Sequence, residues 1–123
     1  MSSPEKRAFA ESLRLLVELQ DLDLMIKEAA VQEEKDLGFK IEDVSKLQEA
    51  RQNLAMSIDP VVLRIYERLL RRYERAVAPV HGGICLGCFM TLPTALCQSV
   101  QRHQGVSLCE NCGRILYWLG GEG

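Results

Sequence analysis

Four cysteines near the C-terminus form two C-x-x-C pairs, and their thiols are the side chains of this sequence best suited to chemistry. The first pair is Cys85 and Cys88, the second is Cys109 and Cys112, and 20 residues lie between the pairs. Each C-x-x-C turn directs two sulfurs toward one point, and this spacing is typical of a zinc ion held by four thiolates. We therefore predict one structural Zn²⁺ bound by these four cysteines. Because four thiolates close the coordination sphere, no position remains for a catalytic water or substrate.

The thiols and the other reactive or aromatic residues have alternative roles. A redox-active thiol pair of the thioredoxin kind needs a βαβ context, which the sequence does not show. Cys97 is predicted to be a small buried residue in a short helix, rather than a fifth ligand or reactive thiol. His81 and His103 are possible ligands, but we expect surface or polar-contact roles because four cysteines suffice. Tyr117 and Trp118 are expected to pack the region or its joint with the helices, with base stacking as the alternative.

Three helical patterns precede the cysteines in the sequence. Residues 4–37 predict one helix about 50 Å long, with Ser2 or Ser3 as its cap and Gly38 at its end. Residues 41–58 predict a second helix, with Arg51 as a polar interruption. A third begins with Asp59 as its cap and Pro60 in its first turn, and it includes Tyr73. The first helix has leucines and other apolar residues at steps of four and three, which predict a coiled-coil seam: Leu15, Leu19, Leu22, Ile26 and Ala29.

After about residue 78 the pattern changes to short β-like segments and glycines, with one short helix near Pro93. The predicted fold is mainly α: an antiparallel helical hairpin, bent near Pro60, with a small C-terminal β-rich C4 zinc ribbon. The domain boundaries are residues 1–78 for the hairpin, 79–119 for the ribbon and 120–123 for a flexible tail. So small a β-rich region needs a metal because apolar burial alone does not stabilise it.

The charge is unevenly distributed along the 123 residues, whose net charge is −2. Residues 1–59 carry 13 acidic and 8 basic residues, whereas residues 60–123 carry 4 acidic and 7 basic residues. No apolar run approaches the roughly 20 residues needed to span a bilayer. The charged N-terminus lacks the apolar core of a signal peptide, so we expect a cytoplasmic protein with reduced thiols. No nucleophile–base set, phosphate loop or catalytic carboxylate pair is evident, and we expect no enzymatic activity.

Four segments, covering about residues 57–119, resemble a known family. They are IDP at 58–60, YERLLRRYERAVAPV at 66–80, GGICLGCFMTLP at 82–93 and LCENCGRILYW at 108–118. They resemble bacterial coiled-coil proteins that end in a C4-type zinc ribbon and carry a nucleic-acid-binding label. The resemblance implies the same four zinc ligands and a non-enzymatic interaction protein, associated in some members with transcription, flagellar or secretion machinery. Family members have a longer coiled coil, so this chain resembles a shortened member.

Two functions follow as hypotheses. In the first, an adaptor binds protein or nucleic acid through its hairpin and a stripe of arginines spaced to share one face of the third helix: Arg64, Arg68, Arg71 or Arg72, and Arg75. The alternative for this stripe is a solvated surface with Glu67 and Glu74 pairing locally. The second function resembles the DksA/TraR group, which inserts an acidic hairpin tip into RNA polymerase. Acidic residues surround the predicted tip here: Glu33, Glu34, Asp36, Glu42 and Asp43.

Overall fold

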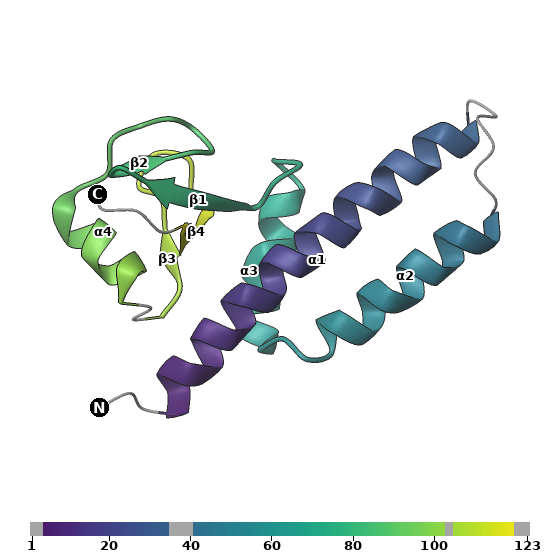
Figure 1. Ribbon diagram of the computed structural model, residues 1–123, viewed down its shortest axis with the longest axis horizontal. Helices are drawn as coiled ribbons and strands as arrows, with labels where there is room; N and C mark the ends of the chain where they lie inside the picture. The colour runs from purple at the N-terminus through teal and green to yellow at the C-terminus, as the bar shows by residue number, and fades with distance from the viewer. Residues whose placement is uncertain (1–3, 35–40, 103–104, 120–123) are drawn as a thin grey trace.

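The computed structural model describes residues 4–34, 41–102 and 105–119, with side chains described from residue 11 to 31 and from residue 44 onward (Figure 1). Helix α1 is Pro4–Glu34, α2 is Ile41–Ala55 and α3 is Pro60–Leu70. The predicted caps at Ser2, Ser3 and Gly38 lie outside the described residues. Absence of Gly and Pro from the interior of α1 allows one unbroken helix of this length. No described helix is long and apolar enough to cross a membrane.

Helices α1 and α2 lie side by side and run in opposite directions, and α3 then turns back and crosses α1 (Figure 1). The predicted mainly α fold with a small C-terminal sheet is thereby confirmed. Helix α2 ends at Ala55, three residues earlier than predicted, and Ile58 is buried in the turn that follows. The cap of α3 is as predicted, because the Asp59 carboxylate accepts hydrogen bonds from the backbone N–H groups of Val61 and Val62.

Tyr73, predicted as part of the third helix, lies outside it, since α3 ends at Leu70 and Arg71 is its C-cap. The backbone N–H of Tyr73 still donates to the Leu69 carbonyl, at 2.9 Å, but the chain turns there to enter the sheet. Tyr73 itself is held by the ribbon, because its hydroxyl donates to the Cys112 carbonyl oxygen at 2.7 Å. Tertiary contacts therefore end the helix where its apolar spacing alone would continue it.

The C-terminal region is a four-stranded sheet with the order β2-β1-β4-β3. Strand β1 is Val77–His81, β2 is Ile84–Cys85, β3 is Ser107–Leu108 and β4 is Ile115–Trp118, with α4 at Thr94–Gln101. The two central strands, β1 and β4, are parallel, whereas β2 and β3 pair antiparallel at the edges. The β-like segments and the short helix predicted from the sequence are therefore present.

This sheet separates two apolar cores because successive strand residues point to opposite faces. Val77 of β1 and Ile115 of β4 pack with the three helices in the first core, the helical core. Their neighbours Ala78 and Leu116 pack with α4 and the cysteines in the second core, the core of the ribbon. Gln20 of α1 joins the helices to the strand edge: its side chain accepts a hydrogen bond from the Val77 N–H at 2.8 Å and donates to the Val77 carbonyl at 3.2 Å. The helices and the ribbon therefore share one interface of apolar packing and backbone hydrogen bonds.

The predicted seam of α1 is correct in part. Leu19 and Ala29 are buried, but Leu15, Leu22 and Ile26 are only partly buried. Leu16, which is not part of the predicted seam, is fully buried. The difference arises because α1 packs against α3 and β1 as well as against α2, so a wider stripe of its surface is covered than a two-helix seam requires.

Replacing Leu16 is therefore expected to destabilise the fold more than replacing Leu22. Leu16→Ala should lower the free energy of unfolding by about 3 kcal/mol, because it leaves a cavity in a closed core. Leu22→Ala on the same helix should cost about 1 kcal/mol, because this side chain is already partly in solvent. Urea denaturation of both zinc-loaded variants measures the difference. Equal losses would show that the two-helix seam, and not the wider core, governs the stability of α1.

Candidate metal centre

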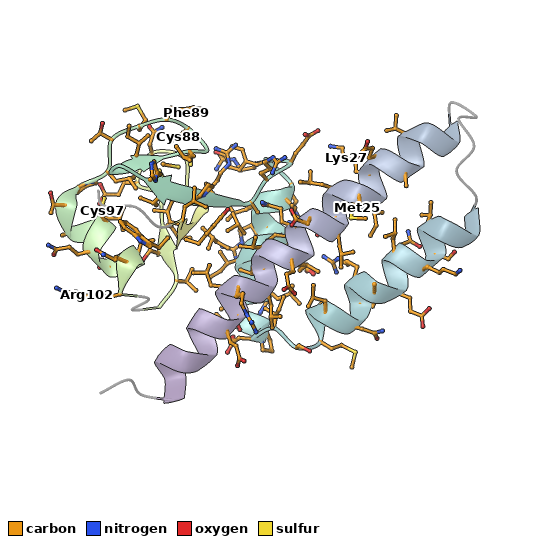
Figure 2. The ribbon with its side chains drawn as sticks, in the orientation of Figure 1. Met25, Lys27, Cys88, Phe89, Cys97 and Arg102 are labelled. Atoms are coloured by element: carbon orange, nitrogen blue, oxygen red, sulfur yellow. The ribbon has the colours of Figure 1, made fainter. Side chains whose placement is uncertain are left out.

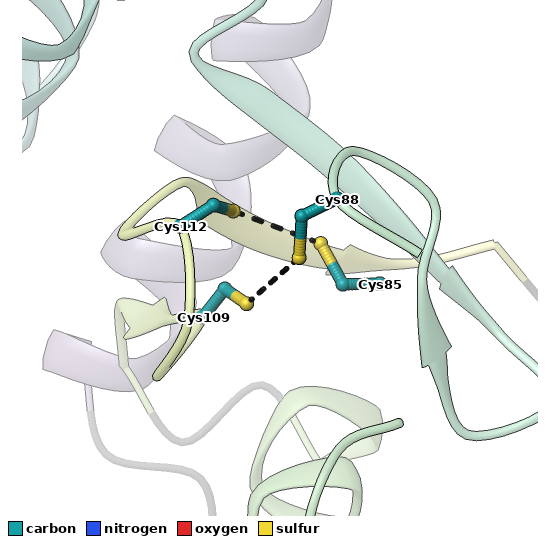
Figure 3. A group of neighbouring side chains, drawn as sticks. All are labelled: Cys85, Cys88, Cys109 and Cys112. Carbon is teal, nitrogen blue, oxygen red and sulfur yellow. Dashed lines mark hydrogen bonds between the residues drawn. The ribbon is translucent and has the colours of Figure 1, made fainter. Parts of the chain in front are cut away.

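The four predicted ligands come from two turns that face each other across the ribbon (Figure 3). Cys85 ends β2, Cys109 follows β3, and Cys88 and Cys112 complete the two turns. All four sulfurs lie within 4.8 Å of one another. The Sγ–Sγ distance is 3.9 Å between Cys85 and Cys112 and 3.6 Å between Cys88 and Cys109. Four sulfurs placed tetrahedrally about 2.3 Å from zinc are about 3.8 Å apart, so the thiols fit this ion.

The two turns have the same backbone hydrogen bonds. In the first, the Phe89 N–H donates to the Cys85 carbonyl at 2.7 Å and the Cys85 N–H donates to the Met90 carbonyl at 3.1 Å. In the second, the Gly113 N–H donates to the Cys109 carbonyl and the Cys109 N–H donates to the Arg114 carbonyl, both at 2.9 Å. The turns are therefore equivalent knuckles, residues 85–90 and 109–114, and each aims two sulfurs at the same point.

The residue after each second cysteine has a left-handed backbone, with φ of 62° at Phe89 and 82° at Gly113. Glycine adopts this conformation readily, whereas a bulky side chain is strained in it. Phe89 gains little burial in return, since it is 73% exposed and lies on the outer edge of the ribbon (Figure 2). The first knuckle therefore carries a strain that the second avoids.

Substituting this residue is expected to relieve the strain. Phe89→Gly should raise the free energy of unfolding of the zinc-loaded chain by about 1 kcal/mol, as expected for removing a left-handed non-glycine residue. Phe89→Ala keeps the strain and serves as the control for loss of the aromatic ring. Thermal melts of the three proteins give the comparison. A variant with Gly that is no more stable than the variant with Ala would contradict the prediction.

In the absence of metal, burial and hydrogen bonding shift the pKa values of Cys85, Cys88 and Cys112 in different directions. Burial raises the pKa of Cys85 to about 12 and also raises the pKa of Cys112, although hydrogen bonds from Arg114 act in the opposite direction. A hydrogen bond from the Asn111 side chain is the main cause that lowers the pKa of Cys88 to about 6. Zinc must therefore displace protons from Cys85 and Cys112, because thiolates are the ligands.

The other candidate residues lie outside the sulfur cluster. Cys97 is partly buried and packs against the second core, in line with its predicted packing role. Tyr117 packs against the helical core and Trp118 against the core of the ribbon, as predicted. His81 is exposed on β1, and His103 lies outside the described residues.

The structure adds two residues near the metal site that sequence spacing did not single out. Tyr73 donates to the Cys112 carbonyl, and the Arg114 guanidinium lies 3.9 Å from the centre of the Tyr73 ring. Arg114 also donates through Nε to the Arg75 carbonyl at 2.8 Å. The sequence offered no signal beyond an arginine after the second C-x-x-C, because these contacts join residues about 40 positions apart.

Comparison with protein families agrees with this geometry: residues 84–116 match the model described as a C4-type zinc ribbon domain. This chain carries a C4-type zinc ribbon. The predicted C4 zinc ribbon and its structural zinc are confirmed by this match together with the clustered sulfurs. The ribbon's four thiolates supply a closed coordination sphere, so the ion would hold the two knuckles together.

Two solved structures resemble a larger part of the chain than the ribbon alone. CT398 from Chlamydia trachomatis is 33% identical over 72% of this chain and 39% of its own, with a TM-score of 0.63. HP0958 from Helicobacter pylori is 25% identical over 85% of this chain and 44% of its own, with a TM-score of 0.60. The chain therefore spans less than half the length of either structure. Among curated proteins, no significant match is found.

Proposed function

We propose that this chain is a non-enzymatic zinc-ribbon adaptor that binds an anionic surface of a protein or nucleic acid through an arginine face beside the ribbon. The observation that carries this proposal is a group of exposed arginines with no carboxylate oxygen within 4.0 Å among the described residues. We define the arginine face by its members: Arg64, Arg68, Arg71, Arg72 and Arg75. Guanidinium groups bind both phosphate and carboxylate with two parallel hydrogen bonds.

The arginine face is not the single helical stripe that the sequence predicts. Arg64 and Arg68 lie one turn apart on α3, and Arg71 is its C-cap with a helical backbone. Arg72 lies in the following turn and Arg75 lies just before β1, so the last two are placed by the turn. The face therefore runs from α3 onto the joint between the helices and the ribbon.

The neighbouring glutamates do not neutralise this face. Glu67 lies 3.6 Å from Arg51 of α2, and Glu74 lies 2.8 Å from Lys27 of α1. Glu67 and Glu74 therefore pair with residues of other helices instead of pairing locally with the arginines as the solvated-surface alternative expects. Cations near the C-terminus of α3 also interact favourably with the helix dipole. This effect acts only within the last turn, so it does not account for a group of five arginines.

The outer part of the ribbon is a poorer site for an anion. No Asp, Glu, Lys or Arg occurs from residue 76 to residue 101, although 26% of the whole chain is charged. Four thiolates with one Zn²⁺ also leave the centre itself with a net negative charge. Electrostatic attraction for phosphate or carboxylate is therefore concentrated on the arginine face.

The DksA/TraR alternative depends on the acidic hairpin tip. Its residues are Glu33, Glu34, Asp36, Glu42 and Asp43, and their side chains lie outside those described. No described contact favours that function, and it stays a prediction from the sequence.

The test compares two variants that remove the same charge. Arg64→Gln, Arg68→Gln and Arg71→Gln are combined in one variant, and Arg14→Gln, Lys46→Gln and Arg102→Gln in the control. Binding to labelled duplex DNA, single-stranded RNA and polyglutamate is measured by anisotropy at several salt concentrations. For a nucleic acid, the first variant should lower the log–log salt slope by about 2–3, because each lost phosphate contact lowers it by about 0.7–0.9.

Preferential weakening of polyglutamate binding would instead indicate an acidic protein surface. The proposal fails if the two variants bind all three probes with equal affinity while both retain zinc and their thermal stability.

A further inference from the structure

Arg114 touches three parts of the molecule that are distant in the sequence. It directly follows Gly113 in the second knuckle, and its Nε donates to the Arg75 carbonyl in the turn after α3. In the first knuckle it packs against Gly87, where an added Cβ would lie 2.8 Å from the Arg114 Cδ. A guanidinium in this place is therefore fixed against both knuckles and against the arginine face.

Tyr73 completes this contact from the side of the helices. Its ring lies under the Arg114 guanidinium at 3.9 Å, and Arg72 lies 5.3 Å from the same ring. Its hydroxyl donates to the carbonyl of the metal ligand Cys112 at 2.7 Å. One side chain of the turn between α3 and β1 therefore holds the backbone of a zinc ligand.

The same two residues favour the metal-bound state of the knuckles. Arg114 follows Cys112 by two residues, and its guanidinium is held beside the second knuckle by the Arg75 carbonyl and the Tyr73 ring. Its positive charge offsets part of the negative charge of four thiolates around one Zn²⁺. Hydrogen-bond partners that orient metal ligands contribute about 10–100-fold in metal affinity.

We propose that Tyr73 and Arg114 are positioning residues that couple zinc binding to the arrangement of the turn carrying Arg71, Arg72 and Arg75. Coupling of two binding or conformational equilibria is reciprocal, so a turn that favours zinc is itself ordered by zinc. The consequence, a partner surface that depends on zinc, rests on the proposed function. The coupling itself does not, because it is measurable with zinc alone.

A purely structural role predicts a different result, and the chain offers matched controls. Tyr66 is a buried tyrosine, whereas Tyr73 is partly buried, and the Tyr66 hydroxyl donates to the Asp23 carboxylate at 2.7 Å within the helical core. Tyr73→Phe and Tyr66→Phe therefore each remove one hydroxyl hydrogen bond, and one of them acts on a zinc ligand. For the arginine, Arg102→Met is the control, because Arg102 is the exposed C-cap of α4 and lies on the opposite side of the ribbon from Cys88 of the first knuckle (Figure 2).

The experiment measures the zinc affinity of the full chain by competition with a chromophoric chelator. Tyr73→Phe and Arg114→Met should each lower the affinity about tenfold, and Tyr66→Phe and Arg102→Met by less than about twofold. With Co²⁺ in place of zinc, the first two should also shift the ligand-field absorption bands, which report on the geometry of the thiolates. Arg114→Lys keeps the charge but not the planar group, so incomplete recovery of affinity is expected.

Amide exchange of residues 71–76 is then compared with and without zinc. In the wild-type chain, zinc should slow this exchange, and in Arg114→Met the effect of zinc should be reduced at least threefold. Equal zinc affinities for Tyr73→Phe and Tyr66→Phe, or an unchanged effect of zinc on residues 71–76 in Arg114→Met, would overturn the proposal. If Arg114→Met does not fold, the tyrosine pair decides alone. None of these readouts involves a partner, so failure of the adaptor function leaves them unaffected.

Discussion

Removal of zinc with a chelator is expected to unfold the ribbon and to loosen α3. Three of the ligands, Cys85, Cys109 and Cys112, are themselves buried members of the second core. The ion therefore joins the two halves of this core, and apparent binding energies of structural zinc reach about 10–16 kcal/mol. That exceeds or equals the total stability of most small domains, about 5–15 kcal/mol. Val77 and Ile115 also belong to the helical core, so the effect should extend into the helices.

Native mass spectrometry should find one zinc per chain, and near-ultraviolet circular dichroism should lose the signal of the packed aromatic residues after chelation. Cys112→Ser should prevent loading, whereas Cys97→Ser should retain one zinc, because Cys97 lies outside the sulfur cluster. A chain without metal that keeps four free thiols and an unchanged aromatic signal would refute the metal site.

The metal centre could be predicted from the sequence because its information is local. A C-x-x-C turn specifies its own geometry within a few residues, and two such turns leave little choice of ligand set. The cap at Asp59 and the helices were predictable for the same reason, since capping residues and apolar spacing act over one or two turns.

Contacts between segments that are distant in the sequence could not be predicted from local patterns. Gln20 pairs with the backbone of Val77, 57 residues away, and nothing in the periodicity of α1 marks a polar residue as buried. Arg51 interrupts the apolar pattern of α2, and the pattern alone predicts only a polar residue on this helix. The structure shows it bound to Asp23 of α1 and close to Glu67 of α3. Such pairs depend on how the helices cross, which spacing within one helix does not determine.

The second large effect is expected at Asp23, where one carboxylate holds all three long helices. Its Oδ1 accepts from Arg51 Nε at 3.0 Å and its Oδ2 accepts from the Tyr66 hydroxyl at 2.7 Å. Both carboxylate and guanidinium are mostly buried, with about a fifth of each side chain exposed. Burial and the hydrogen bond to Asp23 together raise the pKa of Tyr66, so its hydroxyl stays a proton donor.

Asp23→Leu is therefore expected to lower the free energy of unfolding by about 3–5 kcal/mol, because it leaves a partly buried guanidinium and a buried hydroxyl without their acceptor. Asp21→Leu, on the exposed side of the same helix, is the matched control and should cost less than about 0.5 kcal/mol. Adding Arg51→Met and Tyr66→Phe to Asp23→Leu should recover part of the loss, since an apolar replacement of the whole network leaves no unpaired polar group. Urea denaturation of the zinc-loaded proteins gives each value. If the triple variant is less stable than Asp23→Leu alone by the sum of the separate losses, the three side chains act independently and the network does not join the helices.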